Sequence, residues 1–374
     1  MTVNATSISA GQALAMLKAG WEAQTRGELT ASWMLHGKPG IGKTQVAEAL
    51  AAFVGGKLYD VRLTTIDPSD LRGLPYYDHD EKLTKWYRPE DLPRGTSPAI
   101  LFLDELSAAP EHIQPTVYGL LQERRVGQHI IPDNVMIVAA GNRVEDGAVA
   151  YEMGTAIADR LIHLNVEPDL DDWIDNYAVK KGLHPAVPAF LKVRPDYFET
   201  NEKSMEQDHL IAATPRSWDR VSSIMLSISD PALRRIAVTG TVGAHVCMEF
   251  FVVADDVEAT VAVTEMISKP RQERLNMYPT TMHGLQAMVF GLVGLANETN
   301  METVFEILVD MMDLVRLRPK DDGFARLPLA ELTTYGFESV LSKLLDSGLG
   351  AEILENPIYK AYSAKRQELG LEIG

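Results

Sequence analysis

Eight residues in the first part of this chain constrain its fold more than any other stretch. Gly37-Lys38-Pro39-Gly40-Ile41-Gly42-Lys43-Thr44 has the spacing G-x-x-x-x-G-K-[ST]. A β-like apolar run at residues 33–36 precedes it, and a helical run at residues 45–53 follows it. Glycines let a backbone wrap a phosphate chain with its N–H groups turned inward, and the new helix adds the positive end of its dipole. The sequence therefore predicts a strand, a phosphate-binding loop and a helix, in that order.

The last two residues of this loop carry the chemistry of a nucleoside triphosphate site. Lys43 would reach the β- and γ-phosphates, and the Thr44 hydroxyl would hold Mg²⁺. We therefore expect ATP and Mg²⁺ as cofactors. The residues expected to bind the nucleotide are Gly37, Lys38, Pro39, Gly40, Ile41, Gly42, Lys43 and Thr44.

A second apolar run supplies two acidic residues. Residues 99–103 are continuously apolar, which is typical of a parallel strand buried on both faces, and Asp104 and Glu105 follow directly. Ligands of an open α/β sheet bind at the carboxyl ends of its strands. Asp104 would hold the Mg²⁺ shell, in part through water, and Glu105 would polarise the attacking water. These two carboxylates predict an enzyme that splits ATP into ADP and phosphate.

A third strand, at residues 135–139, leads to Gly141 and Asn142. An Asn after Gly is usually a turn residue. At the end of the strand that follows the acidic one, however, its amide would lie beside the γ-phosphate and help to place the water. We therefore include Asn142 among the candidate catalytic residues.

The order of the apolar runs predicts the fold class. Residues 1–30 carry one amphipathic helix at about 9–25, and the pattern then alternates between strand and helix up to about residue 168. This alternation favours an α/β P-loop core with a doubly wound parallel sheet of five strands. After residue 168 helical periodicity replaces the strand pattern. The predicted strands are residues 33–36, 58–63, 100–103, 135–139 and 161–166.

An insertion at about residues 67–95 interrupts this alternation. It is rich in Pro, Gly, Tyr and Asp, and long loops of this kind are often functional. Exposed aromatic residues there could grip a polypeptide. Alternatively, Tyr76, Tyr77 and Trp86 pack the insertion onto the core. The sequence leaves both interpretations open.

Composition limits the partners and the compartment. The formal charge is −17, so most of the surface would repel nucleic acid, and contact with DNA would have to be local. Cys247 is the one cysteine; we expect a buried thiol in a reducing cytoplasm. The first residues lack the features of a secretion signal, and the longest uncharged apolar stretch, about residues 287–296, is too short to span a bilayer. We expect a cytoplasmic protein with no membrane partner.

Taken together, these motifs resemble those of AAA+ ATPases and, within that superfamily, of the MoxR-type group. The resemblance covers residues 33–221, about half of the chain. The first two motifs are shared by all P-loop ATPases, whereas the ordered set is more specific. The segments that carry it are residues 37–44, 101–106, 122–127, 139–143, 158–161 and 214–218, with residues 70–75 similar to the insertion of that group.

The resemblance implies roles for three further side chains. Asn142 would be sensor 1, Arg160 the arginine finger that reaches a neighbouring subunit, and Arg216 the sensor-2 arginine of the same subunit. A guanidinium at the transferring phosphoryl group is worth about 10³–10⁵ in rate. The residues alone leave alternatives: Arg160 could form an ordinary salt bridge with Asp159 or Glu167, and Arg216 could be a solvated helix start. Arg143 and Arg220 are weaker candidates for the same chemistry.

The resemblance also implies a domain order and an assembly. We expect an N-terminal helical segment at 1–30, the AAA+ domain at 31–168, a helical lid at 169–235 and a helical C-terminal region at 236–374. That last region carries no motif, and similar MoxR-type chains often end before it. An arginine finger implies a ring of identical subunits, which in this superfamily is usually a hexamer.

The function implied by the resemblance is remodelling or activation of a protein client by a ring-forming Mg-ATP hydrolase, with a von Willebrand factor A-type partner. One alternative is an AAA+ motor or loader on nucleic acid. Another is an ATP-gated assembly scaffold with slow turnover. The basic residues that could serve the nucleic-acid alternative are Lys82, Lys85, Arg88, Arg94, Arg124 and Arg125.

Overall fold

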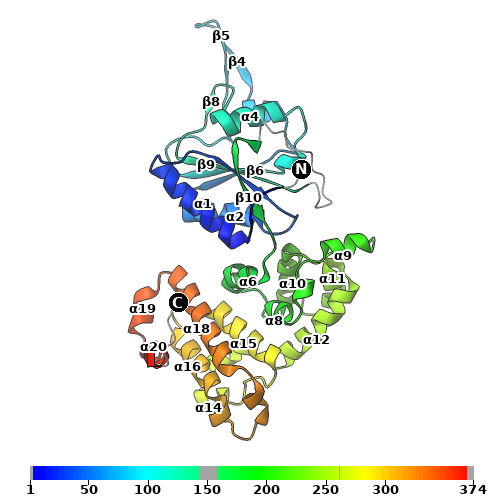
Figure 1. Ribbon diagram of the computed structural model, residues 1–374, viewed down its shortest axis with the longest axis vertical. Coiled ribbons are helices and arrows are strands. Elements are labelled where there is room, and N and C mark those ends of the chain that lie inside the picture. The colour runs from blue at the N-terminus through cyan, green and yellow to red at the C-terminus, as the bar shows by residue number, and fades with distance from the viewer. Residues whose placement is uncertain (1–2, 144–157, 261, 369–374) are drawn as a thin grey trace. The chain divides into compact units, whose positions relative to one another are not determined.

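The structure is a computed structural model, and it describes residues 3–143, 158–260 and 262–368 (Figure 1). The chain divides into two compact units, Met1–Asp169 and Leu170–Gly374. The first unit contains the sheet, and the described part of the second is helical. Each unit is described separately below.

The main sheet of the first unit has six strands in the order β1-β10-β2-β9-β6-β3, and every neighbouring pair is parallel. All five predicted strands are present, so the predicted parallel P-loop sheet is confirmed. The sixth strand, at one edge, was not predicted. The strands are β1 (Ser7–Ile8), β2 (Ser32–His36), β3 (Lys57–Arg62), β6 (Ala99–Asp104), β9 (Val135–Gly141) and β10 (Leu161–Val166).

Strand β1 escaped prediction because two residues show no periodicity. It pairs with the end of β10, with Ser7 opposite Asn165 and Ile8 opposite Val166. The next residue, Ser9, caps helix α1 (Ala10–Thr25): its Oγ accepts from the Gln12 N–H at 3.1 Å, and the Gln12 side chain accepts from the Ser9 N–H at 3.0 Å. This capping box fixes where the strand stops and the helix begins.

Helices cover both faces of the sheet, which explains why the central strands β6 and β9 are buried and almost entirely apolar. Trp33 and Leu35 pack with α1 and with α2 (Lys43–Phe53) on one face. Met34, between them in the sequence, packs on the opposite face with α4 (Gln114–Glu123). Figure 1 shows α1 and α2 together and α4 apart from them. The two half-cores hold the strand ends, and so the loops after them, in place.

The insertion forms defined secondary structure. Helix α3 (Pro68–Arg72) leads into an antiparallel hairpin of β4 (Pro75–Asp78) and β5 (Leu83–Trp86), which projects from the unit in Figure 1. A second hairpin, β7 (Arg125–Val126) and β8 (His129–Ile130), lies against it. The Gln128 side-chain amide donates to the Trp86 carbonyl at 3.0 Å, and Arg88 donates to the Ile130 carbonyl at 3.1 Å. The two hairpins therefore form one body.

The described residues of the second unit form helices and no strand. Their shared core is built around large side chains such as Phe190, Trp218, Phe250, Phe305 and Phe337. The main helices are α6 (Leu170–Trp173), α7 (Val179–Lys181), α8 (Ala186–Val193), α9 (Asn201–Glu206), α10 (Pro215–Ser227), α11 (Pro231–Val242), α12 (Ala244–Thr260), α13 (Val263–Ser268), α14 (Arg271–Arg274), α15 (Met282–Leu295), α16 (Met301–Met312), α17 (Leu314–Leu317), α18 (Leu329–Asp346), α19 (Gly350–Glu355) and α20 (Pro357–Glu368).

The helical periodicity after residue 168 predicts one continuous helix over residues 231–253, but the structure has two helices there. Gly243 has φ of +87°, which stops α11, and α12 begins at the next residue. The two helices pack together, and Arg235 of α11 pairs with Asp255 of α12. Cys247 lies in this hairpin and is buried, as predicted, with the Thr239 hydroxyl 3.2 Å from its Sγ.

The domain boundary predicted at residue 235 falls within the shared core. Trp218 and Val221 precede that point, Phe250 and Ala254 follow it, and all four belong to one cluster of buried residues. That the lid and the C-terminal region are separate domains therefore stays a prediction.

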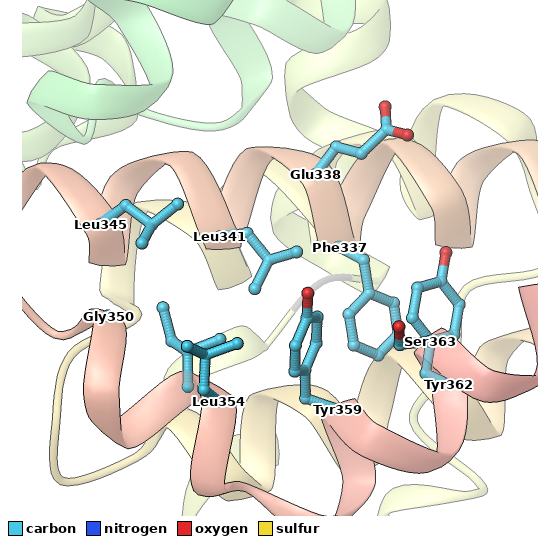
Figure 2. Close-up of a pocket in the computed structure, with 10 residues that line it drawn as sticks. Phe337, Glu338, Leu341, Leu345, Gly350, Leu354, Tyr359, Tyr362 and Ser363 are labelled. Carbon is cyan, nitrogen blue, oxygen red and sulfur yellow. The ribbon is translucent and has the colours of Figure 1, made fainter. Parts of the chain in front are cut away.

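An apolar pocket of about 270 Å³ lies between α18, α19 and α20. Figure 2 shows Leu341, Tyr359 and Tyr362 around it, with Glu338 at its border. Its lining contains one carboxylate and no cationic side chain, so the pocket lacks the charge that a polyphosphate ligand requires.

Candidate functional site

The predicted site residues of the first unit follow neighbouring strands. β2, β9, β6 and β3 are adjacent and parallel, so the loops after them share one edge of the sheet. The glycine-rich loop follows β2, Asn142 follows β9, and Asp104 ends β6. The structure thus brings these three predicted elements to a common edge.

The glycine-rich loop has backbone geometry that other residues rarely adopt. Gly37 has φ of +151°, and a Cβ on it would lie 2.3 Å from the Val166 carbonyl oxygen. Gly42 has φ of +103° and is the N-cap of α2. Gly42 has no side chain that could cap this helix. A helix start of this kind, directly after a strand, suits an anion.

The Lys43 ammonium is held over this loop. Its Nζ lies 2.5 Å from the Gly37 carbonyl oxygen, 2.9 Å from that of Lys38 and 3.0 Å from Asn142 Oδ1. The contact with Asn142 is informative because the two residues are far apart in the sequence. It joins the predicted phosphate-binding lysine directly to the predicted sensor residue.

The two acidic residues differ in their surroundings. The Asp104 carboxylate is mostly buried and accepts from the Glu105 N–H at 2.9 Å. Glu105 has φ of +59° and ψ of +33°, a left-handed conformation that is uncommon for a residue with a side chain. Its carboxylate accepts a hydrogen bond from the Thr64 hydroxyl. The Arg62 guanidinium lies 3.7 Å from Glu105 and 3.8 Å from Asp104.

Thr64 and Arg62 are site residues that the sequence analysis missed. They lie at the end of β3 and just after it, beside the acidic strand β6. No motif marks them, and a usable signal exists for Thr64 alone, as a polar residue directly after the strand predicted at residues 58–63. On the same strand, burial and the nearby charge of Asp104 raise the pKa of the Asp60 carboxyl. The environment of Asp104 is therefore set by β3 as well as by its own strand.

The first unit also has the oxygen ligands that Mg²⁺ needs. Within the described ranges no three His, Cys, Asp or Glu residues gather into a metal-binding group. A nucleotide-bound Mg²⁺ needs only one or two protein oxygens, since phosphates and water supply the rest. The half-buried Thr44 hydroxyl and the Asp104 carboxylate are hard oxygen donors of this type. These residues fit the ion.

Arg160 lies at the amino ends of the parallel strands, whereas the glycine-rich loop lies at their carboxyl ends. It directly precedes Leu161, which pairs with Ser32 at the start of β2, whereas the loop begins after the last residue of β2. At roughly 3.3 Å per residue, the backbones of Arg160 and Gly37 are about 20 Å apart along the strands. The arginine of one chain therefore does not start from the same end of the sheet as its own phosphate-binding loop.

Glu167, one of the partners considered for Arg160, is used by another residue. Arg143 pairs with the Glu167 carboxylate and donates to Asn165 Oδ1 at 3.2 Å. The Arg143 side chain is only 10% exposed. These contacts give Arg143 a structural role at the end of β10.

Arg216 is exposed near the start of α10, in the second unit. Thr214 caps this helix together with Ser217, which explains the local Thr-Pro-Arg-Ser sequence. Arg220, one turn later, is also exposed. The sensor-2 role of Arg216 stays a prediction.

Most of the basic residues considered for nucleic acid have partners within the first unit. Lys85 Nζ lies 2.8 Å from both Asp78 and Glu81, and these bonds raise its pKa. Arg124 donates to the carbonyls of Pro132 and Val135, and burial lowers its pKa. Arg88 and Arg125 likewise donate to backbone carbonyls. Lys82 and Arg94 are exposed.

The aromatic residues of the insertion divide between the two interpretations. Tyr76 stacks on Tyr87 with ring centroids 4.4 Å apart, and the Arg72 guanidinium covers Trp86 at 4.3 Å. These residues hold the hairpin together. Tyr77 and Leu74, in contrast, are 72% and 70% exposed. The hairpin therefore has both packed aromatic side chains and exposed apolar ones, whereas its turn, residues 79–82, is polar.

Comparisons with known proteins agree with this geometry. Residues 32–161 match the AAA domain (dynein-related subfamily). The strand order and this match give the first unit the P-loop AAA+ fold. No curated protein matches the chain.

Solved structures similar to the chain are distant. A proposed ATPase from Cytophaga hutchinsonii matches at 16% identity and a TM-score of 0.32, over 62% of this chain and 81% of that chain. A point mutant of RuvB from Thermotoga maritima matches at 14% identity and a TM-score of 0.34, over 98% and 97%. The RuvB Holliday junction branch migration motor of the same organism matches at 14% identity and 0.31, over 98% and 95%. Within the described residues no helix is long and apolar enough to cross a membrane.

Proposed function

We propose that this chain, with its AAA domain at residues 32–161, is an ATPase that binds ATP and Mg²⁺ and splits ATP into ADP and phosphate. One observation carries the proposal. Lys43 contacts Asn142, and Asp104 and Glu105 end the strand next to that of Asn142. A phosphate-binding cation, a sensor amide and two carboxylates thus come from three adjacent strand ends, where nucleoside triphosphate hydrolysis needs them.

In this proposal each residue has one task. Lys43 binds the β- and γ-phosphates, and Thr44 and Asp104 hold the Mg²⁺, which neutralises charge on the phosphate oxygens when bound. Glu105 accepts a proton from the water whose oxygen attacks the γ-phosphorus, as the bond to the bridging oxygen of ADP breaks. Asn142 orients that water. The Thr64 hydroxyl donates to one of the two carboxylate oxygens of Glu105, which holds that side chain in place.

The proposal extends to a ring of identical subunits, with a hexamer as the expected form. Arg160 would act on the nucleotide of a neighbour, and its place at the far edge of the sheet from its own loop supports this. Arg216 would act as sensor 2 within its own subunit. The active site would then be complete only between two subunits.

We further propose a protein client, handled as in the MoxR-type group together with a von Willebrand factor A-type partner. The exposed Tyr77 on β4 and Leu74 just before that strand support a polypeptide contact. The net charge of −17 and the internal partners of Lys85, Arg88 and Arg124 weigh against nucleic acid. The cytoplasm is the proposed compartment.

The test is ATP turnover by the purified chain with Mg²⁺, compared with Glu105→Gln. We expect wild-type turnover, and in the variant a loss of at least about 100-fold with ATP still bound. A Glu105→Gln pull-down in ATP should retain the client. Equal turnover in both proteins would refute the assignment of Glu105.

Two other outcomes would redirect the function. DNA that stimulates turnover, with the steep salt dependence of phosphate contacts, would indicate a nucleic-acid motor. ATP-dependent assembly without turnover would indicate the scaffold. The bond between Thr64 and Glu105 is the observation that keeps this second alternative in view.

A further inference from the structure

Two histidines connect the strand of the phosphate-binding loop to the turn that carries Arg160. His36 ends β2, and His163 lies on β10 beside it. His36 Nε2 is 2.7 Å from His163 Nδ1, and the ring planes differ by 18° with centroids 5.0 Å apart. His36 is 8% exposed. Neither histidine has a task in the nucleotide chemistry proposed above.

The hydrogen bonds fix a direction along this pair. His163 Nε2 lies 2.8 Å from the Ala158 carbonyl oxygen, which can only accept, so Nε2 carries the proton. In the neutral ring Nδ1 is then the acceptor, and His36 must donate to it from Nε2. The donor chain therefore runs from His36 through His163 to the backbone of Ala158.

The two ends of this chain are next to the two halves of the proposed active site. His36 immediately precedes Gly37, the first residue of the phosphate-binding loop. Ala158 is two residues before Arg160, at the opposite edge of the sheet. Besides the sheet pairing of β2 with β10, the hydrogen bonds of the two histidines connect the carboxyl ends of the strands to their amino ends. They tie the backbone of the arginine turn to the strand that ends in the loop.

We propose that His36 and His163 are positioning residues that hold the Arg160 turn in register with the phosphate-binding loop of the same subunit. The pair then determines where each subunit presents its arginine to the next. This inference rests on the proposed function, because it requires that Arg160 acts on a neighbouring nucleotide. If the pair only stabilised the fold, its loss would instead affect ATP binding and ATP turnover of the same subunit alike.

Substitution of His163 by Asn or by Gln tests its two hydrogen bonds separately. At position 163, Asn keeps a polar group near the place of Nδ1 but is too short to reach the Ala158 carbonyl, whereas Gln reaches the place of Nε2. We expect His163→Asn to lower ATP turnover about tenfold, with the Kd for ATP within about twofold of wild type. His163→Gln should stay within about threefold, and so should His36→Gln, which keeps the donor toward His163.

ATP turnover by mixed rings separates the two roles, because a purely structural role of His163 would not let a neighbouring subunit restore turnover. His163→Asn subunits have an intact loop and Glu105, and Glu105→Gln subunits have an intact arginine turn. If His163 acts through Arg160 in the neighbouring subunit, a 1:1 mixture of the two variants should recover roughly a quarter of wild-type turnover. The reason is that about one subunit interface in four joins an intact Glu105 to an intact arginine turn. The control mixture is Arg160→Ala with Glu105→Gln.

The outcomes are distinguishable. If the control mixture recovers activity and the His163→Asn mixture does not, the positioning role is wrong. If His163→Asn alone turns over ATP like wild type, it is also wrong. If the control mixture recovers no turnover while the wild type hydrolyses ATP, Arg160 does not act across a subunit interface. This inference is then wrong, while the ATPase assignment stands.

A measurement on the wild-type chain covers the case in which His163→Asn does not fold. Nitrogen-15 NMR of histidine side chains reports which ring nitrogen carries the proton. We expect the Nε2–H tautomer for both His36 and His163 in the nucleotide-free protein. An Nδ1–H tautomer at His163 would contradict the donor chain and overturn the proposal.

Discussion

At the scale of single residues, the candidate site depends on side chains whose partners no motif records. Lys43, Asp104 and Asn142 could be assigned from spacing and strand ends alone, because the G-x-x-x-x-G-K-[ST] pattern and apolar strands are local features. The contact between Lys43 and Asn142 could not be predicted, since it depends on which strands become neighbours. Thr64 shows the same limit: its hydroxyl has meaning only beside Glu105, which comes from another strand.

The bond from Thr64 leads to a prediction about the rate of hydrolysis. Thr64→Val removes the hydroxyl while keeping the shape of the side chain, so Glu105 loses a partner that holds its carboxylate. We expect basal turnover to rise about two- to tenfold, the range that a net hydrogen bond of about 0.5–1.5 kcal/mol allows. The measurement is kcat for ATP without client. Thr64→Ser, which keeps the hydroxyl, is the matched control, and a fall in kcat for the valine variant would show that Thr64 assists Glu105.

At the scale of elements, strands were predictable because buried parallel strands are apolar on both faces. Elements that depend on a single residue or a partner were harder. Gly243 divides one predicted helix into α11 and α12, and β1 exists only because it pairs with β10. The insertion was recognised from its composition, whereas its hairpin is held by contacts such as Arg72 on Trp86.

The exposed side chain of Tyr77 on that hairpin carries a prediction about client binding. Tyr77→Ala removes a side chain that is 72% exposed, so folding and basal turnover should change little. Capture of the client by the Glu105→Gln protein in ATP should fall at least about fivefold if Tyr77 is an interface anchor, as aromatic residues often are.

The matched control for this variant is Tyr76→Ala on the same strand. Tyr76 stacks on Tyr87, so its loss should loosen the hairpin and lower thermal stability, which Tyr77→Ala should not do. Unchanged client capture with Tyr77→Ala would exclude Tyr77 as a client contact.

The turn before α8 carries a prediction about acid stability. Burial, together with the charge of Arg234, lowers the pKa of His184 from 6.5 to about 4. The unfolded chain therefore binds a proton in this window that the folded protein does not, and stability is lost as the pH falls from about 6.5 toward 4. The size of the effect is at most about 3.5 kcal/mol, at about 1.4 kcal/mol per pKa unit.

Chemical denaturation at several pH values measures this effect. His184→Gln, which cannot be protonated, should show a smaller loss of unfolding free energy between pH 6.5 and 4.5 than wild type. The Ser222 hydroxyl accepts from the backbone N–H of residue 184, so that bond survives in the variant. Parallel pH curves for the two proteins would show that His184 is not the group responsible.

At the scale of the whole molecule, the role proposed for Arg160 would make assembly a requirement for catalysis. Its turn lies about 20 Å along the strands from the loop of the same chain, by the rise of a strand. The arginine reaches a γ-phosphate only if a second copy brings its own loop to that edge. Turnover per chain should therefore depend on concentration, rising as the ring forms.

Light scattering and turnover measured together over a dilution series check this requirement. We expect the ATP-loaded Glu105→Gln protein to form the ring and the nucleotide-free chain to be smaller. In the wild type, specific activity should fall as the ring dissociates. Arg160→Ala should still bind ATP while losing turnover by about 10³-fold or more, since a guanidinium at the transferring phosphoryl group supplies that much. A dilute, monomeric wild-type chain with undiminished activity per subunit would contradict the shared site, because one subunit alone would then contain everything that hydrolysis needs.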